Sequence, residues 1–239
     1  MSSISFETLR RETLDANLEI MRHGLVLYTF GNASGISRAD GVAVIKPSGV
    51  PYEKLRPEDM VLTDLEGRVL EGSLRPSSDL PTHLALYKAF STIGGVVHTH
   101  SEFATAWAQA RRPIPCLGTT HADYFHGPVP VTDPLEPYEI GEGYEKNTGL
   151  VICRTFKDRD PDAVPAVLVA GHAPFCWGRT PGDAAHTAVI LEAAARMAYY
   201  TVHLAPDAAP IAQHLLDKHF FRKHGSGAYY GQVKGGDHG

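Results

Sequence analysis

The sequence predicts an α/β protein in which helices cover a sheet. Short runs of β-branched and aromatic residues alternate with amphipathic or alanine-rich stretches, and turn residues separate them. The chain has 239 residues, of which 43% are hydrophobic, so it is long enough to bury a core. We find no repeat, low-complexity tract or Gly/Ser-rich linker, and we expect one domain over residues 1–239. Hairpin signals beside helical crossovers leave the direction of the strands open.

The expected helices are recognised by apolar spacing and by end signals. The first follows Ser5 and ends at Gly24, because glycine readily adopts the conformation that closes a helix. In the second, Pro81 occupies the first turn, where proline is tolerated. Further helices are expected over residues 81–90, 103–110, 181–205 and 210–221.

The expected strands are short and lie between turn residues. Glu66-Gly67 separates two of them and predicts a hairpin. The stretch from Pro113 to Pro137 is expected to hold mostly loops and short strands. Strands are expected over residues 25–30, 42–45, 60–63, 68–70, 166–170 and 175–178, with another that ends at His98.

Charge and cysteine content exclude several classes of protein. A net charge of -5 gives no overall field that attracts nucleic acid or an anionic membrane, so an anionic substrate must be held by local groups. Cys116, Cys153 and Cys176 form no CxxC pair, which argues against a disulfide framework and against a thiolate metal site. We expect a cytoplasmic protein without a membrane span, because no apolar run approaches the roughly 20 residues that a membrane helix requires.

A candidate metal site begins with His98 and His100. Residues two apart on a strand project from the same face, so both imidazoles can reach one divalent ion. Taken alone, the pair is as readily explained by two ordinary histidines. His172, after a buried-looking strand, adds a third ligand, and three neutral imidazoles leave one coordination position open, as in catalytic zinc sites. Asp79 is an available carboxylate, although an Asp just before Pro81 is also a common helix cap.

Three short motifs offer backbone N–H and hydroxyl donors of the kind that hold phosphate, although each is also an ordinary turn. They are Gly31-Asn32-Ala33-Ser34, Lys46-Pro47-Ser48-Gly49 and Pro76-Ser77-Ser78.

Two further segments carry candidate groups. Asp123 is a proton-transfer group, a helix N-cap or a solvated loop carboxylate, and its spacing alone favours the last two. The basic, tyrosine-containing tail over residues 217–231 is either an anion site or the coat of a terminal helix.

In order and wording these motifs resemble the L-ribulose-5-phosphate 4-epimerases of the class II aldolase/adducin superfamily, from about residue 9 to Gln232, with 233–239 outside the resemblance. The matching blocks are Gly31-Asn32 with Ser34, Val44–Val50, Pro76–Asp79, His98–Ser101, Gly118–Phe125 and Tyr229–Gln232.

The resemblance implies a three-layer α/β/α sandwich on a mainly antiparallel sheet. It also implies a four-fold symmetric homotetramer with active sites at the subunit interfaces. A sugar phosphate is the implied substrate.

Residue roles follow from the same resemblance. It implies Zn²⁺, or alternatively Mn²⁺ or Co²⁺, on His98, His100 and His172, with Asp79 where related aldolases usually carry a glutamate. Asp123 would form the acid/base pair with Tyr230 of a neighbouring subunit. The substrate phosphate would be held by Asn32, Lys46, Ser48, Gly49, Ser77 and Ser78, with His219 and Arg222 from the neighbour.

One departure from the family pattern lies at the third ligand. The family more often has His-x-His-Gly-Pro-Phe, whereas this chain has Ala170-Gly171-His172-Ala173-Pro174-Phe175, so the groups that support His172 are in question. His121 has no assigned role. The remaining histidines, His83 among them, are interpreted as helix ends, surface positions or tail.

The reaction that the resemblance implies inverts C4 of a ketopentose phosphate, a carbon without an acidic C–H. The chain lacks the Gly-x-Gly-x-x-Gly fingerprint of a nicotinamide site, which favours bond cleavage over transient oxidation. We expect retro-aldol cleavage of L-ribulose 5-phosphate to an enediolate and glycolaldehyde phosphate, followed by re-addition to D-xylulose 5-phosphate. The alternatives are a class II aldolase of the L-fuculose-phosphate type and a non-catalytic adducin-type assembly domain. Arabinose breakdown and ascorbate- or gulonate-linked routes both remain open as pathways.

Overall fold

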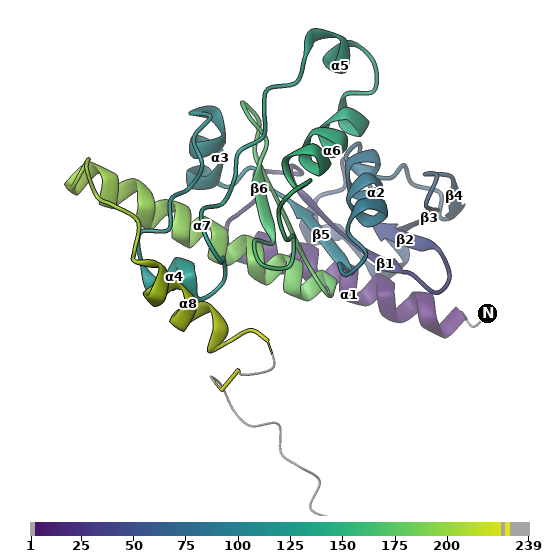
Figure 1. Ribbon diagram of the computed structural model, residues 1–239. Helices are drawn as coiled ribbons and strands as arrows, with labels where there is room; N and C mark the ends of the chain where they lie inside the picture. The colour runs from purple at the N-terminus through teal and green to yellow at the C-terminus, as the bar shows by residue number, and fades with distance from the viewer. Residues whose placement is uncertain (1–2, 226–227, 230–239) are drawn as a thin grey trace, which may run out of the picture.

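One antiparallel sheet organises the chain (Figure 1). The computed structural model describes residues 3–225 and 228–229. The seven strands of the sheet lie in the order β4-β3-β2-β1-β5-β7-β6, and every neighbouring pair is antiparallel. They are β1 (Asn32–Ser37), β2 (Val42–Ile45), β3 (Val61–Asp64), β4 (Val69–Glu71), β5 (Gly95–His98), β6 (Ala166–Leu168) and β7 (Pro174–Gly178).

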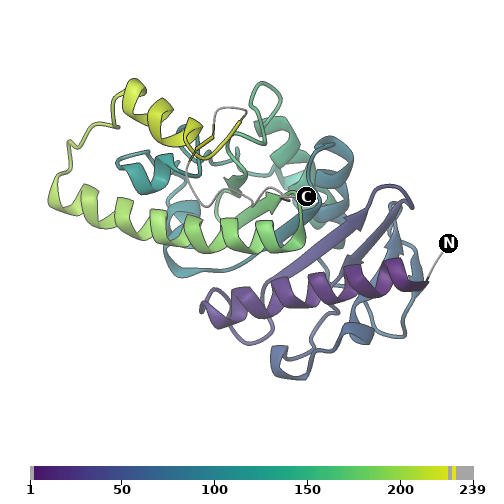
Figure 2. The ribbon, with the colours of Figure 1, turned by 90° about the horizontal axis from the view of Figure 1, so that it is seen from below.

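Helices cover both faces of the sheet, which confirms the predicted layered α/β fold. The long helices α1 (Ser3–Arg22) and α7 (Pro181–Leu204) lie under one face, as the view from below shows (Figure 2). The pair α2 (Leu80–Ala89) and α6 (Tyr144–Thr155) covers the other face. The remaining helical segments are η1 (Tyr52–Lys54), η2 (Pro57–Asp59), α3 (Glu102–Gln109), α4 (Thr119–Ala122), α5 (Pro137–Gly141) and α8 (Gln213–Phe221).

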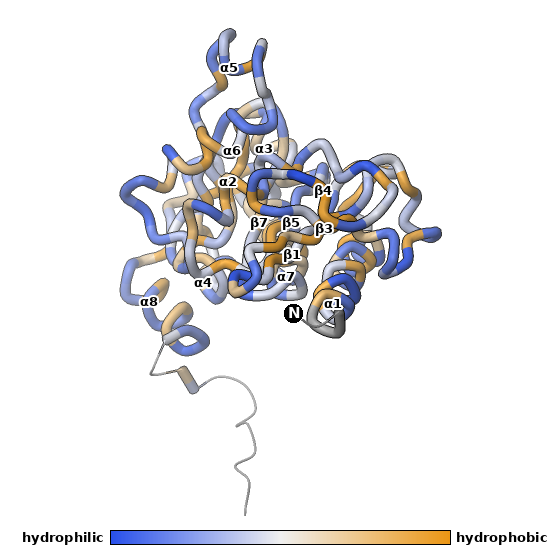
Figure 3. Tube along the Cα trace, turned by 90° about the vertical axis from the view of Figure 1, so that its right-hand side faces the viewer, coloured by the Kyte–Doolittle hydropathy of each residue, from blue (hydrophilic) through white to orange (hydrophobic). Residues whose placement is uncertain are grey.

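Alternation along the strands divides the core in two. On β2, Val42 and Val44 pack with the α1 and α7 side, whereas Ala43 and Ile45 pack with the α2 and α6 side. Both faces of the strand are therefore buried, which is why its residues form an unbroken apolar run. Figure 3 shows these hydrophobic strands at the centre of the molecule and hydrophilic segments around them.

The first strand differs from its prediction. Residues 25–30 form a loop, in which Leu27 and Phe30 are both 58% exposed and Tyr28 has a φ of 52°. The strand starts at Asn32 and has small residues because two helices approach it closely. A Cβ on Gly35 would lie 2.8 Å from side chains of both α1 and α7. The apolar run over residues 25–30 is therefore a loop and not a strand. The small and polar residues of β1 form the strand because the two helices leave no room for larger side chains.

Most other predicted elements are confirmed to within three residues at each end, including the β3–β4 hairpin and the helices at 81–90 and 181–205. The helices α5 and α6 were not predicted, and α4 lies inside the stretch expected to be loops and short strands. None of the helices formed by the described residues is long and apolar enough to cross a membrane.

Candidate active site

The site is built on one row of residues across three strands. Asn32 on β1 pairs directly with His98 on β5, and His98 pairs with Phe175 on β7. Val96 packs in the core on the α2 and α6 side, and His98, two residues later, projects the same way. Register therefore brings Asn32, His98 and Phe175 together beneath the start of α2.

The imidazole of His98 is fixed on two sides. Its Nδ1 lies 2.9 Å from the carbonyl oxygen of Pro174, so Nδ1–H donates to that carbonyl. Its ring stacks on Phe175 with centroids 4.2 Å apart and planes 16° from parallel. The proton on Nδ1 leaves the lone pair of Nε2 free to bind an ion.

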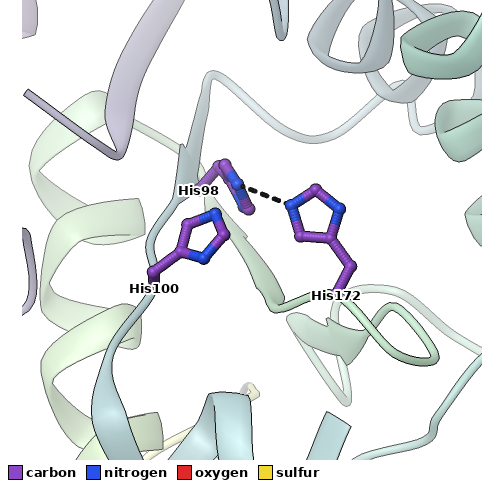
Figure 4. A group of neighbouring side chains, drawn as sticks. All are labelled: His98, His100 and His172. Carbon is purple, nitrogen blue, oxygen red and sulfur yellow. Dashed lines mark hydrogen bonds between the residues drawn. The ribbon is translucent and has the colours of Figure 1, made fainter. Parts of the chain in front are cut away.

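His100 and His172 complete a cluster with His98, as Figure 4 shows. One ligand nitrogen of each residue lies within 4.8 Å of the others, and Nε2 of His172 lies 3.3 Å from Nε2 of His98. Burial, with the neighbouring His98, lowers the pKa of His100 and lowers the pKa of His172 to about 4. Both rings are therefore neutral near pH 7, the form that binds metal, so this donor set fits a divalent ion.

Asp79 lies at the same place, in the N-cap position of α2. No capping hydrogen bond is made by its side chain, which instead accepts one from Asn32 Nδ2 at 2.6 Å. Burial raises the pKa of Asp79, but the nearby His98 and His83 and the Asn32 hydrogen bond outweigh burial and lower it. The carboxylate is thus ionised, and it lines the cavity of the histidines.

The cavity of the histidines has a volume of about 400 Å³. All three phosphate-type motifs contribute to it, through Asn32, Lys46, Ser48, Gly49, Ser77 and Ser78. Lys46 is 2% exposed, and its Nζ donates to the carbonyls of Thr29 and Pro47 at 3.5 and 3.3 Å. The structure therefore joins phosphate-type donors and the candidate metal ligands in one pocket. A larger cavity, of about 780 Å³, lies elsewhere and contains none of these residues.

Asp123 does not line the histidine cavity. Its carboxylate accepts from Arg222 at 3.0 and 2.7 Å and from His219 Nδ1 at 3.0 Å. Partial burial raises the pKa of Asp123, but these hydrogen bonds and the charge of Lys223 outweigh burial and lower it. Asp123, His219 and Arg222 of one chain are therefore a single bonded unit, which we call the Asp123 cluster. Tyr230 lies outside the described residues.

Two buried histidines have structural contacts. His121 is 4% exposed, and burial lowers its pKa to about 4, so Nε2–H of the neutral ring donates to the Gly127 carbonyl at 2.7 Å. His83 is fully buried, with Nδ1 2.7 Å from the hydroxyl oxygen of Ser34. The interpretation of His83 as a helix end or surface position is wrong, because α2 turns this residue toward the sheet.

Tyr144 and Glu145 also line the histidine cavity, and the sequence patterns did not reveal them. Both stand at the start of α6, which was not predicted. The sequence signals that were available are Gly143 before the helix and the apolar pair Val151 and Ile152 within it. In the structure Gly143 is the N-cap residue, with a φ of 71°. Tyr144 Oη lies 2.6 Å from Nδ1 of His172.

Several known proteins are similar to this chain in sequence or in fold. L-ribulose-5-phosphate 4-epimerase UlaF of Salmonella paratyphi A is 51% identical over 226 residues, which cover 95% of this chain and 99% of that protein, and the protein of the same name from Salmonella typhi matches equally. A solved L-fuculose 1-phosphate aldolase has a TM-score of 0.76 at 21% identity, covering 93% of this chain and 97% of its own. L-fuculose-1-phosphate aldolase from Thermus thermophilus has a TM-score of 0.65 at 25% identity over 85% of this chain and 98% of its own.

One family profile also matches most of the chain. That of the class II aldolase and adducin N-terminal domain matches residues 11–199, a range that holds the three histidines, Asp79 and the phosphate-type motifs. The chain therefore belongs to the class II aldolase and adducin family.

Proposed function

We propose that this chain is a metal-dependent L-ribulose-5-phosphate 4-epimerase that forms D-xylulose 5-phosphate. The observation that carries the proposal is the 51% identity, over 95% of the chain, with proteins of that name. The cavity supports it, because three histidines and Asp79 lie there beside phosphate-type donors. An assembly domain has no need of such a cluster.

We propose zinc as the ion, with Mn²⁺ or Co²⁺ as alternatives, held by His98, His100 and His172 together with Asp79. When bound, the ion supplies Lewis-acid polarisation of the ketose carbonyl. The donors at Lys46, Ser48, Ser77 and their neighbours bind the phosphate, which keeps the cleaved fragment in the pocket.

The proposed reaction breaks and re-forms one carbon–carbon bond. A base removes the proton of the C4 hydroxyl, and the C3–C4 bond breaks to give the enediolate of dihydroxyacetone and glycolaldehyde phosphate. The aldehyde turns to present its other face, the bond re-forms, and an acid returns a proton to the C4 oxygen. Asp123 and Tyr230 are the proposed acid/base pair.

The Asp123 cluster determines how the proposed tetramer would share its sites. His219 and Arg222 hold Asp123 within one chain, and this cluster lies outside the histidine cavity of that chain. If His219 and Arg222 serve the site of a neighbouring subunit, Asp123 serves the same site. We therefore propose that one subunit supplies the metal and phosphate pocket and its neighbour supplies the cluster. A cytoplasmic location belongs to the same proposal.

The test is to incubate the zinc-loaded protein with L-ribulose 5-phosphate and to measure D-xylulose 5-phosphate and free dihydroxyacetone. We expect the epimer without release of dihydroxyacetone, and no cleavage of L-fuculose 1-phosphate. His98→Ala should lose zinc and activity together, whereas His23→Ala, at an exposed position just after α1, should keep both. Release of free fragments identifies an aldolase instead, and an active, zinc-loaded His98→Ala protein contradicts the site.

A further inference from the structure

Tyr144 and His172 form a hydrogen-bonded, parallel pair at the wall of the histidine cavity. Tyr144 Oη lies 2.6 Å from His172 Nδ1, and the two rings lie 9° from parallel with centroids 6.0 Å apart. His172 is the ligand whose sequence neighbours depart from the family pattern, since Ala170 stands where that pattern has an imidazole. Its side-chain partner comes instead from 28 residues earlier in the chain.

The position of the protons follows from the nitrogens that face the cavity. Nε2 of His98 and Nε2 of His172 are 3.3 Å apart, so both point to the same place. His98 already carries its proton on Nδ1, which donates to the Pro174 carbonyl. For Nε2 of His172 to offer a lone pair as well, the neutral His172 ring must carry its proton on Nδ1. That N–H then donates to the phenol oxygen of Tyr144.

Tyr144 is anchored well enough to hold this hydrogen bond. It begins α6, and Gly149 of that helix sits so close to α2 that a Cβ there would lie 2.6 Å from the Ala85 Cβ. The hydroxyl of Thr82 on α2 also donates to the Glu145 backbone carbonyl. The helix that carries Tyr144 is thus fixed against the helix that carries Asp79 at its start, and a group on such a support is held more precisely than one on a loop.

We propose that Tyr144 is a positioning residue for the third histidine. Its phenol oxygen accepts the Nδ1 proton of His172, fixes the plane of the ring and leaves Nε2 unprotonated for the ion. This inference rests on the metal site of the proposed function. Removing the outer hydrogen-bond partner of a metal-binding histidine typically weakens metal binding about 10- to 100-fold.

The main experiment compares two variants that each lose one phenol oxygen. Tyr144→Phe keeps the ring beside His172, and Tyr138→Phe removes a phenol that is 74% exposed and does not line the cavity. The dissociation constant for Zn²⁺ is measured by competition with a chelator. We expect it to rise about 10- to 100-fold for Tyr144→Phe and to stay at the wild-type value for Tyr138→Phe.

A second measurement separates positioning from general loosening of the structure. In zinc-loaded protein with ¹⁵N-labelled histidine, the Nδ1 proton of His172 should exchange slowly in wild type and rapidly in Tyr144→Phe, while that of His98 stays protected in both. Wild-type zinc affinity in Tyr144→Phe, or equal weakening in both tyrosine variants, overturns the inference. A wild-type protein that binds no Zn²⁺ overturns the proposed metal site itself, so the two failures are distinguishable.

Discussion

His98 stacks face to face on Phe175, its partner across β5 and β7, with ring centroids 4.2 Å apart. The stack and the Pro174 carbonyl together leave the imidazole one orientation, with Nε2 toward His172. A core phenyl ring thus takes part in preparing the proposed metal site. This contact can be separated by mutation from the contribution of Phe175 to folding.

Phe175→Leu should weaken zinc binding, whereas a matched loss of buried phenyl volume elsewhere on the same face should not. Leucine keeps most of the buried volume, so the free energy of unfolding should fall by only about 1–2 kcal/mol. The stack on His98 is lost, and the dissociation constant for Zn²⁺ should rise by about tenfold, which corresponds to roughly 1.4 kcal/mol. Phe90→Leu is the control, because Phe90 is buried on the same face of the sheet but packs against Phe156 and Trp177. Equal zinc affinities in the two variants contradict this role of Phe175.

Lys46 should make phosphate binding depend on pH. Burial lowers the pKa of Lys46 to about 8, so the ammonium group loses its proton as the pH rises through that value. A phosphate dianion favours the charged form, and its affinity is therefore greatest below pH 8 and falls above it. We expect the dissociation constant for inorganic phosphate to rise by up to about tenfold per pH unit above 8, as measured by calorimetry from pH 7.5 to 9.5. Lys46→Met should bind weakly at every pH, whereas Lys54→Met, on an exposed 3-10 turn, should behave as wild type. A steep pH dependence that persists in Lys46→Met excludes this lysine as its source.

His121 should make the fold sensitive to mild acid. Burial lowers its pKa from 6.5 to about 4, so between these values the unfolded chain binds a proton that the folded chain does not. The folded state therefore keeps its full stability above pH 6.5, where His121 is neutral in both states. It loses stability as the pH falls from 6.5 toward 4, because only the unfolded chain gains the proton. The loss amounts to at most about 3 kcal/mol. His121→Gln should therefore show a shallower fall in the free energy of unfolding over this range, measured by urea titration at several pH values. His203→Gln controls for the loss of a histidine elsewhere, and a slope in His121→Gln equal to that of wild type contradicts the assignment.

Short-range patterns predicted the parts of the site that are close in sequence. The spacing of His98 and His100 predicted that both imidazoles lie on one side of a strand. The strand β5 ends at His98, so His100 lies two residues beyond it, but the ring centroids of the two histidines are 5.0 Å apart as the spacing led us to expect. The segment that carries Leu27, Tyr28 and Phe30 misled the prediction, because an apolar run does not distinguish a buried strand from an exposed loop. No local pattern indicated that Gly35 lies in a strand, since that choice depends on two helices that cross it.

Long-range contacts could not be derived from local patterns. Asn32 reaches Asp79 because β1 pairs with β5 beneath the start of α2, which only the strand order determines. Asp123 receives its partners from 96 and 99 residues later in the chain. Both pairings depend on tertiary packing, and neither has a short sequence spacing of the kind that drew attention to His98 and His100.

Mixing two inactive variants should restore activity, if neighbouring subunits share each site. His98→Ala removes a proposed metal ligand, and Asp123→Asn alters the Asp123 cluster, so neither variant alone should turn over substrate. The Asp123→Asn subunit keeps an intact metal pocket, and the His98→Ala subunit keeps an intact Asp123 cluster. In the proposed tetramer, a mixed assembly can therefore contain complete sites built from one subunit of each kind. With equal amounts and random assembly, about one quarter of the sites should be complete.

The measurement is epimerase activity after the two proteins are dissociated together, reassembled and reloaded with zinc. Separately treated variants serve as controls, together with a mixture of His98→Ala and His100→Ala, in which every metal pocket is defective. If the mixture of His98→Ala with Asp123→Asn stays as inactive as that control, Asp123 does not act in the site of a neighbour.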